Sequence, residues 1–187
     1  MNNLRIIIFS LTLIVGTGAG VTQGYTQWAV GMGYLAIMSD YAGGMKWFRA
    51  AAEKGHAKAR LHLGCRYCEG IGVEVDFVRG VELYEQSAKQ GHVNAQFNLS
   101  HLYKNGSLDN ENGNPMTIPK NLPLHFKWAL ASAEQGHIRG QSYTGNCYEE
   151  GWGVEQNYAS AFEWYMKAAE QEDAYAQRCT GICFERG

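Results

Sequence analysis

The stretch Ala59-Arg-Leu-His-Leu-Gly-Cys-Arg-Tyr-Cys-Glu-Gly70 decides the fold of this 187-residue chain. Ala59, Leu63 and Tyr67 recur at every fourth position, which places them on one stripe of a helix. Gly64 lies beside that stripe, where the missing side chain lets a second helix approach closely. The segment that begins at Gly70 suits a turn, so the helix is predicted to end there.

A second helix is predicted over the residues that follow this turn. Val81, Tyr84 and Ala88 recur at helical spacing and share one face. Gly91 is positioned to end the helix, as a glycine at a helix C-terminus commonly does. The unit is therefore a helix A, a loop, a helix B and a tight turn.

The same unit recurs along the chain at near-constant spacing. Two frames of equal length, 59–94 and 140–175, flank a longer frame, 95–139, whose extra residues fall in the A–B loop around Ser107 to Ile118. A partial repeat, 25–58, precedes them, and a terminal helix, 176–187, follows. Each unit of such a series buries its apolar face only against its neighbours, which predicts a solenoid.

Three histidines recur with the architecture. His56, His92 and His137 each follow the glycine of a B-to-A turn. A residue that recurs with the frame is more often a turn or cap element than a ligand, so these three are interpreted as structural.

The recurring string resembles the Sel1-like repeat, a tetratricopeptide-like repeat with a longer A–B loop. The resemblance rests on Ala59-x3-Leu63-Gly64-x2-Tyr67-x2-Gly70-x-Gly72-Val73 and on Gly145-x2-Tyr148-x2-Gly151-Trp-Gly-Val154. It implies an all-α fold, an α-solenoid of stacked helix-loop-helix repeats in a right-handed superhelix. Residues 21–187 are expected to form this one repeat domain.

The N-terminus has the layout of a secretory signal peptide. Arg5 precedes the apolar run Ile6–Val15, and the small residues Gly16–Gly20 follow. The run is shorter than the ~20 residues that a membrane-spanning helix needs, which favours cleavage over an anchor. Residues 1–20 are therefore predicted to be removed, and the protein to be periplasmic or secreted, without membrane insertion after cleavage.

Charge and motifs argue against two classes of function. The net charge of −2 gives no electrostatic reason to expect nucleic acid as a partner. The chain contains no Gly-x-Ser-x-Gly, no phosphate-binding loop and no His-Glu-x2-His. Some cysteine-rich relatives of the resembled family are described as β-lactamase-like, but the Ser-x2-Lys that such chemistry needs is absent. No catalytic residue, metal or cofactor is predicted, and the protein is predicted not to be an enzyme.

The five cysteines leave several alternatives open. Neighbours at i, i+3 or i, i+4 of a helix hold their Cβ atoms ~5–6 Å apart, so a Cys65–Cys68 disulfide would be strained. Cys147 and Cys183 share a frame position and are interpreted as small packing residues, although a Cys147–Cys179 bridge is possible. His62, Cys65 and Cys68 are ligand-type residues, and a metal-binding or thiol-redox role for them is a minority hypothesis.

The leading hypothesis is a non-enzymatic protein–protein interaction adaptor of the bacterial envelope or secreted space. The resemblance implies that A helices line a concave face that binds a protein or peptide. The predicted contact residues on that face are Leu61, Cys65, Cys68, Glu69, Phe97, His101, Lys104, Ser142, Asn146, Glu149, Arg178 and Ile182.

A second predicted contact region is the insert, where apolar side chains interrupt a polar loop. They are Leu108, Met116 and Ile118. Loops that break a repeat's length often contact partners. Two alternative functions stay open: a periplasmic immunity protein that neutralises a delivered toxin, and a β-lactamase-like or cell-wall hydrolase, which the missing Ser-x2-Lys disfavours.

Overall fold

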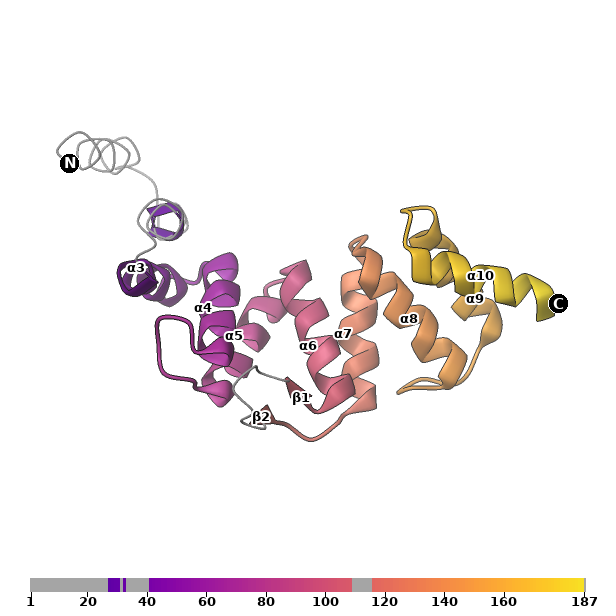
Figure 1. Cartoon of the computed structure of the whole chain (residues 1–187), viewed down its shortest axis with the longest axis horizontal. Coiled ribbons are helices and arrows are strands. Elements are labelled where there is room, and N and C mark those ends of the chain that lie inside the picture. The colour runs from indigo at the N-terminus through magenta and orange to yellow at the C-terminus, as the bar shows by residue number, and fades with distance from the viewer. Residues whose placement is uncertain (1–26, 31, 33–40, 109–115, 187) are drawn as a thin grey trace. The chain divides into compact units, whose positions relative to one another are not determined.

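The structure is a computed structural model that describes residues 27–30, 32, 41–108 and 116–186 (Figure 1). The chain divides into two compact units, residues 1–90 and 91–187. The predicted signal peptide lies outside the described residues. Among the helices of the described part, none is long and apolar enough to cross a membrane.

The first unit packs its helices in sequence order. It contains α3 (Tyr41–Glu53), α4 (Ala57–Glu69) and α5 (Phe77–Lys89), and α4 contacts both of the others. The predicted stripe of α4 faces the core, which confirms the helical periodicity of the sequence. The buried members of this core are Met45, Phe48, Ala51, Ala52, Ala59, Leu63 and Tyr67.

The second unit continues the same pattern of adjacent helices. Its elements are α6 (Val93–Asn105), β1 (Ser107–Leu108), β2 (Met116–Thr117), α7 (Leu122–Glu134), α8 (Ile138–Glu150), α9 (Tyr158–Ala169) and α10 (Ala174–Arg186). Each helix of the unit packs against the next along the chain, as Figure 1 shows for α6 to α10. The all-helical repeat architecture predicted from the sequence is confirmed, with a two-stranded ladder added in the insert.

Glycine permits the close approach of A and B helices. A Cβ placed on Gly64 of α4 would lie 3.0 Å from the carbonyl oxygen of Gly80 and 3.0 Å from the Tyr84 ring of α5. The helices could not hold this separation with a larger residue, because few real Cβ atoms have contacts so short. The predicted role of Gly64 is confirmed.

The recurring histidines begin the A helices. His56, His92 and His137 are the N-caps of α4, α6 and α8, so each helix starts one residue after its histidine. Nδ1 of His56 accepts a hydrogen bond from the Ala59 N–H at 3.2 Å, and Nδ1 of His137 accepts one from the Gly140 N–H at 3.1 Å. The interpretation as turn or cap elements is confirmed by position for all three histidines, and the side-chain cap bond is formed by His56 and His137 but not by His92.

One backbone hydrogen bond fixes the A–B loop in all three repeats. Asp76, Asn121 and Asn157 are the N-caps of α5, α7 and α9. The backbone N–H of each donates to the backbone carbonyl of the tyrosine that recurs in the preceding A helix, at 2.8–2.9 Å. These tyrosines are Tyr67, Tyr103 and Tyr148.

The longer loop of the middle repeat preserves that bond. Its two strands pair antiparallel, with Ser107 opposite Thr117 and Leu108 opposite Met116. The N–H of Ile118 then donates to the Gly106 carbonyl at 2.9 Å. The extra residues are therefore accommodated within the loop while α6 and α7 remain paired.

Candidate functional site

Three of the predicted contact positions lie in the protein interior. Leu61, Cys68 and Ser142 are 7%, 2% and 4% exposed, respectively. The Sγ of Cys68 lies against Gly80, where it would collide with any Cβ, and Ser142 Oγ donates to Asp173 Oδ1 at 3.1 Å. Their prediction as surface residues was wrong, because helix periodicity gives an angular position but not the depth of the neighbouring helix.

The other predicted A-helix positions reach the surface of their units to different degrees. Glu69 and Arg178 are exposed. The remainder are half-buried: Cys65, Phe97, His101, Lys104, Asn146, Glu149 and Ile182.

The structure brings three of these positions together with residues of α8 and of the turns at its two ends. The ring of Phe97 stacks on His137 at a centroid distance of 4.5 Å and packs against Tyr143 at 5.3 Å. The ring of His101 stacks on Tyr143 at 6.2 Å. Nζ of Lys104 lies 4.9 Å from the Tyr143 centroid and 4.6 Å from the Trp152 centroid.

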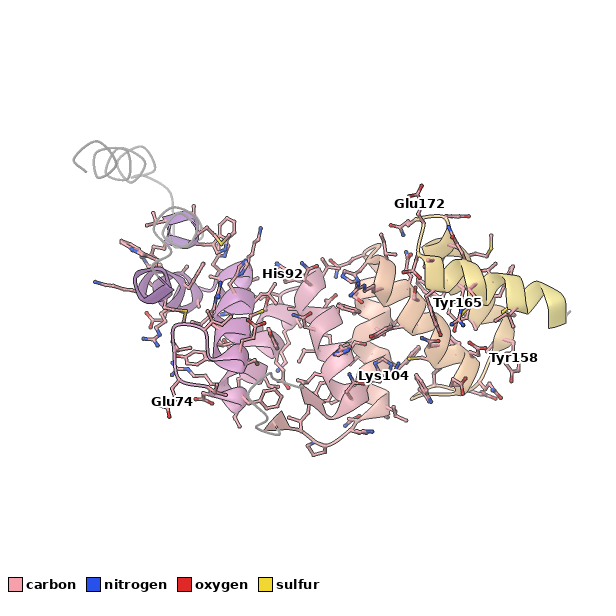
Figure 2. All side chains as sticks on the ribbon, viewed as in Figure 1. Glu74, His92, Lys104, Tyr158, Tyr165 and Glu172 are labelled. Atoms are coloured by element: carbon pink, nitrogen blue, oxygen red, sulfur yellow. The ribbon has the colours of Figure 1, made fainter. Side chains whose placement is uncertain are left out.

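We refer to this cluster as the basic-aromatic face and define it as Phe97, His101, Lys104, Arg139, Tyr143 and Trp152. Figure 2 marks Lys104 on α6, within the second unit. Arg139 is exposed, and the other five members are half-buried. Burial is the main cause that lowers the pKa of Lys104. Burial also lowers the pKa of His101, and the charges of Lys104 and Arg139 lower it further.

Sequence reasoning missed Tyr143, Trp152 and Arg139. One signal was present for Tyr143, since the same frame position holds His62 in the first full repeat and Cys179 in the terminal helix. A residue that departs from its counterparts in other repeats is not required by the repeat itself. Trp152 occurs in the turn where the first full repeat has Ile71.

A buried histidine lies behind the basic-aromatic face. His125 of α7 is 0% exposed, and its Nδ1 lies 2.9 Å from both the carbonyl oxygen and Oγ of Ser100. Its ring meets Tyr143 edge-on at 5.8 Å and lies 6.3 Å from Trp152. Burial lowers the pKa of His125 to about 4, with Lys104 and His101 as minor contributors in the same direction. The imidazole is thus neutral at pH 7.

The α8–α10 region has a different chemistry. The Tyr165 hydroxyl of α9 lies 2.7 Å from Asn146 Oδ1 and 2.6 Å from Glu149 Oε2. The Tyr175 hydroxyl donates to the same Asn146 oxygen at 2.7 Å. Asn146 and Glu149, both predicted contact residues, therefore form a hydrogen-bonded cluster with the two tyrosines.

Cysteines of the first unit form no metal or disulfide site in the structure. None of the five cysteines is joined in a disulfide within the described part of the chain. The Tyr84 hydroxyl donates to Cys65 Sγ at 3.1 Å, and His62 stacks on Phe48 at 5.7 Å, within the core. Across the described ranges, no three His, Cys, Asp or Glu side chains are arranged to hold a metal ion.

The insert residues lie near one another along the small ladder. Leu108 and Met116 are opposite each other in the β1–β2 pair, and Ile118 follows β2 as a half-buried residue. The tip of the insert falls between the described segments.

A cavity in the first unit was not anticipated from the sequence. It has a volume of about 710 Å³ and lies between α3 and the A–B loop that precedes α5. The guanidinium groups of Arg49 and Arg79 lie 5.9 and 4.7 Å from the centroid of the Tyr67 ring in its wall. The lining consists of Arg49, Tyr67, Gly72, Val73, Glu74, Val75, Asp76, Phe77, Val78 and Arg79.

Comparison with protein families identifies the repeat. Residues 24–56, 57–92, 93–137 and 138–173 each match the Sel1 repeat. No curated protein matches the sequence.

Two solved structures are similar over nearly the whole chain. The first is the crystal structure of c5321, a protective antigen of uropathogenic Escherichia coli strains with an SLR fold. It is 32% identical with a TM-score of 0.79, over 96% of this chain and 36% of that one. The second is a Sel1 repeat protein from Oxalobacter formigenes, 26% identical with a TM-score of 0.80, over 98% of this chain and 72% of that one. This chain thus spans about a third of the length of the Escherichia coli protein.

Proposed function

Because the chain belongs to the Sel1 repeat family, we propose that it is a non-enzymatic adaptor that binds a protein or peptide on the A-helix surface of its second unit. Sel1 repeats generally mediate protein interactions. The observation that carries the proposal is the basic-aromatic face. Its aromatic and cationic side chains are partly accessible and differ from their counterparts in the other repeats. Aromatic residues and arginine are enriched at protein interfaces.

The arrangement of polar groups supports binding over catalysis. Ser100 Oγ and His125 Nδ1 are 2.9 Å apart, which resembles a nucleophile with its base. Both residues are 0% exposed, and His125 Nε2 has no hydrogen-bond partner in the described part of the chain. A substrate could not reach the hydroxyl, and no carboxylate of the described segments orients the imidazole as in a catalytic triad.

We place the proposed interaction in the bacterial envelope or the secreted space. Arg5, the apolar run Ile6–Val15 and the small residues after it support export. The partner would then be a protein or peptide of that compartment.

Affinity capture from envelope extracts tests the proposal. Wild-type bait should retain a partner that Phe97→Ala and His101→Ala baits lose, because both substitutions remove parts of the basic-aromatic face. Lys127→Ala is the control, since Lys127 is exposed on the B helix α7 and its Nζ lies over Trp128 at 4.9 Å. Equal retention by all four baits would contradict binding at this face.

A second assay addresses the hydrolase alternative. Purified protein should not turn over a chromogenic β-lactam or peptidoglycan. Turnover that a single substitution in the second unit abolishes would contradict the non-enzymatic proposal.

A further inference from the structure

The basic-aromatic face carries positive charge that the described residues do not neutralise. The ion pair observed in the described part joins Lys89 to Glu85 within α5 and includes no member of this face. Neither Lys104 nor Arg139 has a carboxylate within ion-pair distance among the residues of the described segments. Within the described segments, the cations of the face thus have no anionic counterpart.

The basic groups around the face act on one another as like charges. Lys104 and Arg139 both lower the pKa of His101, and Arg139 lowers the pKa of His137. Lys104 and His101 lower the pKa of the buried His125. Arg139 also lowers the pKa of Tyr143, against the larger effect of burial, which raises it. Cys147 acts on Lys104 in the opposite direction and raises its pKa, against the larger effect of burial.

Two aromatic rings hold the ammonium of Lys104 in place and leave its N–H donors available. It lies over the faces of Tyr143 and Trp152, at 4.9 and 4.6 Å from their centroids. Such cation–π contacts attract the ammonium to the electron-rich ring faces. An ammonium has three N–H donors, so an incoming carboxylate can pair with Lys104 while the rings keep its position.

We propose that the basic-aromatic face binds an acidic segment of a protein partner, with a carboxylate on Lys104 and apolar groups of the segment against Phe97 and Tyr143. The inference rests on the proposed function and specifies the chemistry of the partner. An acidic protein segment fits better than nucleic acid, because the permanent charge of Arg139 and the ammonium of Lys104 make only a short basic region and the chain has a net charge of −2. Nucleic-acid sites usually present a longer basic stripe.

Selection of random peptides against the full chain tests this inference. Phage-displayed 12-residue peptides would be selected on immobilised protein, and enriched sequences measured as fluorescein-labelled peptides by anisotropy. Enriched peptides should contain Asp or Glu, and their binding should weaken several-fold between about 0.05 and 0.5 M salt, since salt screens charge pairs.

Matched variants locate the binding. Lys104→Met keeps an aliphatic side chain against the rings of Tyr143 and Trp152 and removes the charge. Peptide affinity should therefore fall on the order of tenfold. Lys127→Met removes a charge from a similar cation–π contact on α7 and should change affinity less than about twofold. The helical circular dichroism of each variant checks that it is folded.

Other outcomes separate this inference from the proposed function. Enriched peptides without carboxylates that Phe97→Ala no longer binds would overturn the acidic specificity and leave the adaptor function intact. Acidic peptides that bind Lys104→Met as well as wild type would overturn the assignment of the site. Binding of a single-stranded oligonucleotide that requires Lys104 would assign the face to nucleic acid. Enrichment of no peptide, with no partner captured, would contradict both proposals.

Discussion

Gly145 of α8 lies directly against the ring of Tyr165 of α9, where a Cβ on the glycine would be 2.6 Å from two ring carbons. The same relationship joins Gly64 to Tyr84 in the first unit, at 3.0 Å. Gly181 occupies the same frame position in α10, and nothing lies within 4 Å of its Cβ position. The size of the residue at this position of the repeat is thus limited only where a B helix covers it.

Gly145→Ala is expected to destabilise the protein. Overpacking typically costs ~1–3 kcal/mol, which outweighs the ~1 kcal/mol that alanine gains over glycine in a helix. Gly181→Ala is the matched control and should be neutral or stabilising by up to ~1 kcal/mol. Urea unfolding followed by circular dichroism measures both, and equal effects of the two substitutions would contradict the packing argument.

His137→Ala is expected to lower the free energy of unfolding by about 1 kcal/mol, the usual effect of removing an N-cap side chain. His137→Asp should retain most of that stability. Asp173 already serves this purpose one repeat later, where its Oδ1 accepts from the Ala176 N–H at 2.8 Å. Thermal unfolding distinguishes the variants, and an aspartate variant as unstable as the alanine variant would argue against capping.

The stability of the protein is expected to fall as the pH drops from about 6.5 to 4, because His125 is buried as the neutral base. Its pKa is about 4 in the folded chain against 6.5 for the ordinary value. The unfolded chain therefore binds a proton that the folded chain excludes over this interval, so the stabilisation present above pH 6.5 is lost on acidification.

The contribution of His125 to this dependence is on the order of 3 kcal/mol. His125→Asn can still donate to the Ser100 carbonyl and should reduce the pH dependence of the urea midpoint between pH 7 and 4.5. The comparison concerns the slope with pH, so a lower stability of the variant at pH 7 does not affect it. An unchanged slope would be incompatible with a neutral buried imidazole.

Cys68 and Cys147 are expected to resist alkylation in the folded protein at pH 8. Burial raises the pKa of each thiol to about 12, which leaves little reactive thiolate. All five cysteines should be modified by iodoacetamide in denaturant without reductant, because the described part of the structure joins none of them in a disulfide. Mass spectrometry of peptides gives the extent at each site, and a peptide that links two cysteines would contradict this result.

The fold followed from the sequence because its determinants are local. Helical spacing of Ala59, Leu63 and Tyr67, and glycine at Gly64 and Gly70, specify a helix, its contact stripe and its end. Each repeat then packs on its neighbours in chain order, so few alternative topologies compete. The cap role of the histidines was equally accessible, since recurrence with the frame marks a structural position.

The candidate site depended on contacts that periodicity does not give. Leu61, Cys68 and Ser142 share the helix face of Phe97 and Lys104 in the repeat frame, yet they are buried. How far each side chain is buried depends on the residue that a neighbouring element places against it. Gly80 lies against Cys68, and Asp173 lies against Ser142.

The sequence by itself determined the repeat and the helix pairs, because a local period of side chains sets both of them. Comparison of the repeats in the sequence also identified the positions at which they differ. Only the tertiary structure decided which of those positions meet. Tyr143 of α8 and Trp152 after it meet Lys104 of α6 because α7 packs against both α6 and α8. Lys104 is tens of residues from Tyr143 and Trp152 along the chain, yet its Nζ lies under 5 Å from both ring centroids. This contact is set by packing through α7 and not by any local pattern of the sequence.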